Sequence, residues 1–199
     1  MVQYIEQLAQ ALRDPALDGA GPKASSAALN YAIARGACTH FGVDCNELVW
    51  GMPARIAIVA AQALAVKINQ HTANLATLGL RWDRAIEASE EEAEMLLLGE
   101  LEFALEVGHA REAIVEAWLA NPDARELERA LENSNHALMA YWDALKQHKK
   151  LFASIAHNPM LENWRQSFAE PFKANLPWWL NGELEKVAVD VRQEAETVL

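Results

Sequence analysis

Apolar residues recur at helical spacing along nearly the whole of this 199-residue chain, and this pattern most constrains its fold. Between Pro122 and His157 the spacing is close to a heptad repeat. Its apolar positions include Leu131, Leu138, Leu145 and Phe152. Val, Ile and Thr do not alternate with polar residues between turn signals, as they would in strands. The sequence therefore predicts an all-α fold.

The length is sufficient for one domain with a sizeable core, so we predict a single-domain helical bundle over residues 1–199. Residues 1–52 are expected to form short N-terminal helices, one of them over 23–37. Residues 53–157 are expected to form three long core helices. Residues 158–199 combine a segment rich in Trp and Pro with a C-terminal helix.

The central helix is predicted over 53–78, because this segment is apolar on nearly all sides and Gly79 follows it. A second helix is expected from Arg81 to Ala120. A third is expected after the reversal at Asn121 and Pro122, running to His157. Two long helices joined by so short a turn are expected to pack as an antiparallel hairpin.

Negative charge is concentrated in the hairpin segment 81–132. This segment holds 5 basic and 15 acidic residues, so it carries −10 of the chain's net charge of −11. Its first part offers an acidic face made of Glu87, Glu90, Glu91 and Glu94. Because a phosphate backbone would be repelled there, we predict no direct nucleic-acid binding.

The start of the chain shows no basic patch followed by an apolar stretch, and no apolar run reaches the roughly 20 residues of a membrane span. The two cysteines, Cys38 and Cys45, are too few for a disulfide framework. We therefore predict a cytoplasmic protein with reduced cysteines and no membrane contact.

Two helical positions have the carboxylate and histidine spacing of a metal site. Glu106 and His109 lie three residues apart, and Glu132 with His136 is expected at nearly the same height of the hairpin. A helical wheel turns all four residues away from the core, so we predict surface groups and no metal ligand. A carboxylate and histidine metal-binding enzyme remains an alternative.

A second metal alternative is a loop that contains Cys38, His40 and Cys45. Structural zinc sites commonly use paired cysteine knuckles, and this loop has none. We expect the two cysteines to pack as small apolar groups and predict no cofactor.

Glu100 differs from the other acids because the same wheel places it on the apolar face, beside Trp82 and Trp118. A buried carboxylate must be paired, protonated or hydrogen-bonded. Expected partners are an indole N–H or an arginine such as Arg35 or Arg55. Glu100 is thus the predicted perturbed acid, in a structural role or, as an alternative, in a catalytic or ligand-binding one.

Two apolar features favour an interaction with another protein. The first is the aromatic set of the C-terminal segment, which comprises Trp164, Phe168, Phe172, Trp178 and Trp179. These side chains either contact a partner or cover the open end of the bundle. The second is a stripe of Leu98, Leu101 and Leu105 on the acidic side of the hairpin. Its cover would come from another helix of this chain or from a second copy, as a homodimer.

No serine elbow, phosphate loop or metalloprotease motif occurs in the sequence, so we predict no catalytic residue. The expected function is that of a non-catalytic acidic helical protein that works through protein–protein interaction, as an adaptor, regulator or inhibitor. Basic proteins are candidate partners. An alternative is an acidic decoy that blocks a nucleic-acid-binding protein by presenting carboxylates in place of phosphates.

Overall fold

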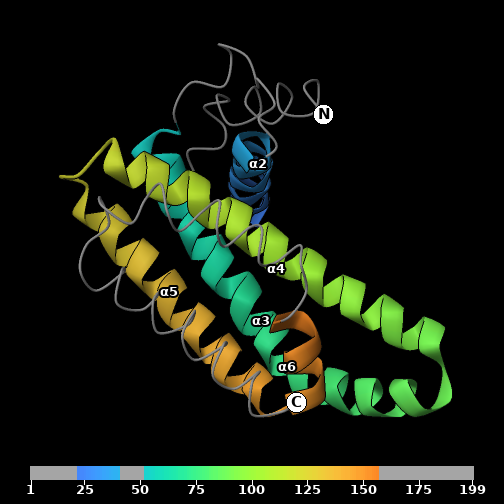
Figure 1. The fold of residues 1–199 in the computed structure, drawn as a ribbon. Helices are drawn as coiled ribbons and strands as arrows, with labels where there is room; N and C mark the ends of the chain where they lie inside the picture. Colours follow the sequence, from blue (N-terminus) through green and yellow to red (C-terminus); the bar gives the residue numbers. More distant parts are fainter. Residues whose placement is uncertain (1–21, 41–51, 157–199) are drawn as a thin grey trace. The chain divides into compact units, whose positions relative to one another are not determined.

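The computed structural model of the chain describes residues 22–40 and 52–156. Of these residues, 92% are helical and none forms a strand, which confirms the all-α prediction. Five helices follow one another in the described residues (Figure 1). They are α2 (Pro22–His40), α3 (Ala54–Ala88), α4 (Glu90–Leu119), α5 (Arg125–Lys146) and α6 (Lys149–Ala156).

The described residues group into two compact units. Unit 1 contains α2, α3 up to Lys67, α4 from Glu106 and α5 up to Asn135. Unit 2 contains the other parts of these three long helices together with α6. The expectation of one domain over 1–199 stays a prediction.

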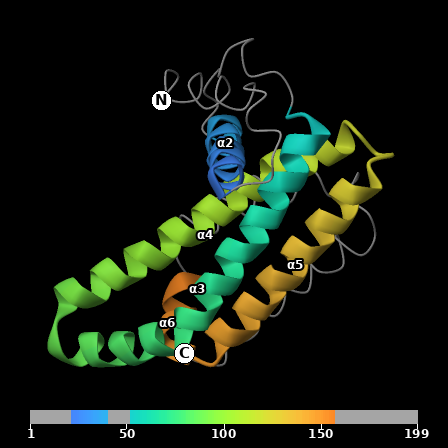
Figure 2. The ribbon, with the colours of Figure 1, turned by 180° about the vertical axis from the view of Figure 1, so that it is seen from behind.

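In unit 1, α2 packs very closely against α4 (Figures 1 and 2). A Cβ atom on Gly36 would lie 1.9 Å from the carbonyl oxygen of His109, so only glycine fits this contact. Nearby, the Arg35 guanidinium donates to both carboxylate oxygens of Glu116, at 3.2 and 2.9 Å. The unit's core is rich in alanine, which lets helices approach one another closely. It includes Ala28, Ala32, Ala57, Ala61, Leu64, Ile114 and Leu127.

In unit 2, α6 and the remaining parts of α3, α4 and α5 enclose a core of larger side chains. The fully buried members include Leu75, Tyr141, Leu145, Leu151, Phe152 and Ile155. Gly79 of α3 lies against the ring of His148, whose Nδ1 would be 2.0 Å from a Cβ on that glycine. Gly79 is therefore a packing position within a helix.

This contact corrects the predicted end of the central helix. Gly79 does not close α3, which continues to Ala88, and the break falls at Ser89. The Ser89 hydroxyl oxygen accepts a hydrogen bond from the backbone N–H of Glu92 at 3.3 Å, as an N-cap residue does. Glu90 and Glu91 add negative charge to the first turn of α4, where the helix dipole favours it.

The helix expected to run from the reversal to His157 is also divided. The reversal itself lies at Asn121 and Pro122 as predicted, but α5 ends at Lys146. The backbone N–H groups of Gln147 and His148 bond to carbonyls three residues earlier, which tightens the last turn before α6 begins. Within the described ranges, no helix is long and apolar enough to cross a membrane.

Candidate functional site

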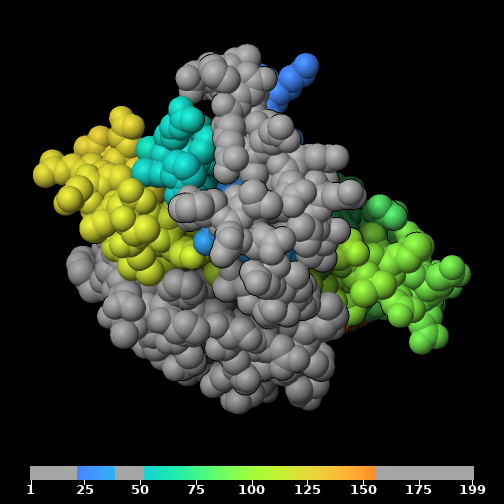
Figure 3. All heavy atoms as spheres, turned by 90° about the horizontal axis from the view of Figure 1, so that it is seen from above, coloured from blue at the N-terminus to red at the C-terminus, as the bar shows by residue number. Residues whose placement is uncertain are grey.

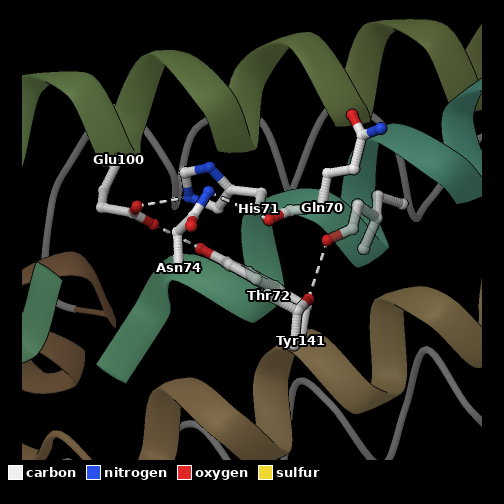
Figure 4. Close-up of polar contacts among 7 residues, drawn as sticks. Gln70, His71, Thr72, Asn74, Glu100 and Tyr141 are labelled. Carbon is white, nitrogen blue, oxygen red and sulfur yellow. Dashed lines mark hydrogen bonds and ion pairs between the residues drawn. The ribbon is translucent and has the colours of Figure 1, made fainter. Parts of the chain in front are cut away.

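A buried carboxylate joins three helices in unit 2. Glu100 of α4 is only 2% exposed, and both of its oxygens have partners. The Tyr141 hydroxyl of α5 donates to Oε2 at 2.8 Å, and Nε2 of His71 on α3 lies 2.5 Å from Oε1 (Figure 4). One carboxylate thus links α3, α4 and α5 through two polar contacts.

Aromatic rings surround these polar contacts. Phe103 stacks on His71 with ring centroids 3.7 Å apart, and Trp142 meets Tyr141 edge-on at 5.2 Å. Burial raises the pKa of Tyr141 well above its usual value, and the Glu100 charge and its hydrogen bond raise it further. The phenol therefore stays protonated and serves as a permanent donor to Glu100.

The helical wheel placed Glu100 inside the apolar face, and it lies there. Its partners differ from those expected. Arg35 pairs with Glu116, and the buried indole N–H of Trp82 has no acceptor among the described residues. The spacing of His71 was a sequence signal that could have found it. His71 lies three residues after Ile68 and four before Leu75, both fully buried, so it shares their face of α3.

The cluster of His71, Glu100 and Tyr141 is connected to solvent at one end. The His71 side chain is 27% exposed, whereas Glu100 and Tyr141 are buried. The Glu100 carboxylate can accept hydrogen bonds from both neighbours. No group of three His, Cys, Asp or Glu side chains within residues 22–40 and 52–156 is arranged to hold a metal ion.

The four residues considered as metal ligands do not share one environment. Glu132 and His136 are exposed, and Glu106 forms an ion pair with Lys67. His109 is buried at 6% exposure, so its predicted surface position is wrong. The reason is α2, which packs on the backbone of His109 and covers a face that a wheel of the hairpin alone leaves open.

Cys38 also departs from the prediction of reduced thiols, because it is disulfide-bonded. A sulfur held in a disulfide is not available as a thiolate ligand for zinc. Cys45 and the side chain of His40, the other members of the candidate zinc loop, lie outside the described residues.

The acidic side of the hairpin is open to solvent. Glu87, Glu90, Glu91 and Glu94 are all exposed. The first turns of α4 are uncovered on the face shown in the space-filling view (green in Figure 3). Met95 is 60% exposed on the same part of α4. We call the exposed residues Glu91, Glu94, Met95, Leu98, Gly99 and Glu102 the α4 outer face.

The predicted leucine stripe is divided between this surface and the core. Leu98 is 47% exposed, Leu105 is half-buried and Leu101 is 3% exposed. The chain itself therefore covers Leu101 and leaves Leu98 on the surface. The aromatic set of Trp164, Phe168, Phe172, Trp178 and Trp179 lies outside the described residues, and its partner-binding role stays a prediction.

Glu112 of α4 is a second buried acid, in unit 1. Its pKa is raised from 4.5 to about 7, first by burial and then by the neighbouring Glu116 charge. A carboxyl group whose pKa is higher in the folded state contributes stability below its unfolded pKa. That contribution is lost as pH rises through the folded pKa, so the window lies between about pH 4.5 and 7.

Replacing Glu112 with Gln removes this titration. We expect the free energy of unfolding of the variant to match that of the wild type near pH 4.5. Above pH 7 we expect it to be higher by up to about 3 kcal/mol. Urea denaturation at a series of pH values measures the difference. Glu132→Gln, at an exposed position in the same unit, serves as the charge control. A stability gain that does not change with pH would contradict the titration of Glu112.

The described residues define an all-α protein whose helices pack against each other around an aromatic cluster. Its two distinctive features are the buried Glu100 cluster and the α4 outer face. No protein-family model, curated protein or solved structure matches the chain.

Proposed function

We propose that this chain is a non-catalytic protein that acts by binding another protein, as an adaptor, regulator or inhibitor. The observation that carries the proposal is the exposure of Met95 and Leu98, two large apolar side chains that stand among exposed carboxylates on α4. Apolar side chains at the centre of a polar rim are the usual composition of a protein-binding surface. The α4 outer face is therefore the proposed binding site.

The Glu100 cluster supports a structural role more than a catalytic one. Glu100 and Tyr141 are buried and bonded to each other, and a catalytic acid or base must reach the atom on which it acts. Only His71 of the three reaches solvent. The cluster then serves to hold the helix that carries the binding face.

The acidic decoy is the second hypothesis, and its salt dependence distinguishes it. A decoy binds through carboxylates alone, so its complex should weaken steeply between low and moderate ionic strength. A complex anchored by Met95 and Leu98 keeps an apolar contribution that salt does not screen. For the metal-binding enzyme, elemental analysis of protein purified without chelator is the test.

A cytoplasmic location and a homodimer stay predictions. One reason for predicting a cytoplasmic location was the expectation of reduced cysteines. The disulfide at Cys38 weighs against that reason, because cytosolic thiols are normally kept reduced. Light scattering at micromolar concentration distinguishes a dimer from a monomer.

The double substitution Met95→Ser with Leu98→Ser tests the proposed site. Both side chains are exposed, so we expect the fold to be retained and partner binding to fall by at least about tenfold. The measurement is affinity capture from native lysate with wild type and variant side by side, quantified by mass spectrometry. Val66→Ser, which removes an exposed apolar residue from unit 1, is the matched control. Equal capture by the double variant and the wild type would reject the site.

A further inference from the structure

We infer that the α4 outer face receives a basic amphipathic helix of a partner protein. The inference rests on the proposed function and specifies the chemistry of the partner. It is drawn from the spacing of the exposed residues, from the open space at Gly99 and from the charge of the face.

The spacing of the exposed residues suits a helix in a lengthwise or shallow crossing arrangement. On a helical wheel at 100° per residue, the exposed residues between Glu91 and Glu102 all fall within a sector of about 140° around the α4 axis. The stripe is about 16 Å long, or three helical turns. Met95 and Leu98 stand at its middle and the carboxylates at its ends and edge. A helix that binds in this way would insert apolar side chains between Met95 and Leu98.

Gly99 gives this face a point of close approach. A glycine inside a helix is unfavourable compared with alanine, and Gly36 and Gly79 have a local reason because a Cβ would collide with their neighbours. Gly99 has no such neighbour, since nothing lies within 4 Å of the position of its Cβ. The position next to Leu98 therefore has open space where a side chain would stand. A helix backbone from outside the chain can approach α4 there.

Charge selects the kind of helix that fits. Glu91, Glu94 and Glu102 belong to the face, and Arg81, which contacts α4 near its start, is paired with Glu92 at 3.1 Å. A second copy of this chain on the same face would bring carboxylates against carboxylates. A helix with Lys or Arg beside its apolar stripe instead complements the face in both charge and hydrophobicity.

A synthetic peptide provides the probe. It is a helix of about 18 residues with Leu at positions i, i+3, i+4 and i+7 and Lys elsewhere. A peptide of the same composition in scrambled order keeps the charge and loses the apolar stripe. Fluorescence anisotropy with the full chain measures both dissociation constants. We expect the patterned peptide to bind at least about tenfold more tightly than the scrambled one.

Variants of the full chain locate the contact. Gly99→Gln places a side chain in this open space without changing charge. We expect it to weaken binding of the patterned peptide by about tenfold while leaving thermal stability equal or higher. Val66→Ser should bind as the wild type does. Equal binding of the two peptides, or full binding by Gly99→Gln, would overturn the inference.

The outcome is separable from that of the proposed function. If the peptides fail but capture from lysate still depends on Met95 and Leu98, the binding site stands and the basic helix is rejected. If light scattering shows a dimer that Gly99→Gln dissolves, the occupant is a second copy and the inference is rejected as well.

Discussion

Replacement of Glu100 with alanine should lower the free energy of unfolding by about 3 kcal/mol. The substitution leaves the buried hydroxyl of Tyr141 without its acceptor and removes the contact to His71. It also leaves a cavity beside Phe103 and Tyr141, which the chain can fill only in part. Urea denaturation followed by circular dichroism measures the loss.

Two further variants show whether this loss comes from the cluster. Glu102→Ala, two residues away on the exposed side of α4, should change stability by less than about 0.5 kcal/mol. In the Glu100→Ala background, Tyr141→Phe should cost less than it does alone, because no hydroxyl then remains to be satisfied. Additive effects of the two substitutions would contradict a coupled hydrogen bond.

Substitution of Gly36 with alanine should destabilise unit 1 by about 3 kcal/mol. The new Cβ would lie 1.9 Å from the carbonyl oxygen of His109, 2.5 Å from its carbonyl carbon and 2.7 Å from its Cα. These atoms belong to the backbone of α4, so no side-chain rotation relieves the collision and α2 must move. Hydrogen exchange should accelerate in α2, and the midpoint of urea unfolding should fall.

Gly99→Ala is the matched control for this prediction. It makes the same chemical change in the middle of a helix, but the added Cβ meets no atom within 4 Å. Helix propensity then determines the effect, and we expect the free energy of unfolding to rise by about 0.5–1 kcal/mol. If both alanine variants behave alike, the close contact between α2 and α4 is wrong.

The buried acid illustrates how far sequence reasoning extends towards a site. Periodicity was enough to place Glu100 inside, because a helix repeats its faces regularly. It was not enough to find His71 and Tyr141, which lie 29 and 41 residues away along the chain. Their approach depends on how far each helix is rotated about its axis, and single-helix patterns do not contain that information.

The helix boundaries show the same difference. The reversal at Asn121 and Pro122 was predictable because proline restricts the residue before it. The end of α3 was not, since Gly79 is typical of a helix terminus by local rules and yet lies inside α3 against His148. Tertiary packing overrode the local preference at this position.

The sequence by itself determined the helical class, the concentration of negative charge in 81–132 and the inward position of Glu100. These properties follow from residue identity and from the fixed period of the α-helix. Only the tertiary structure decided that His109 is covered, that Leu101 is buried while Leu98 is not, and that Gly36 and Gly99 have opposite surroundings. Such properties depend on which helices meet and how closely, and packing between distant segments sets both.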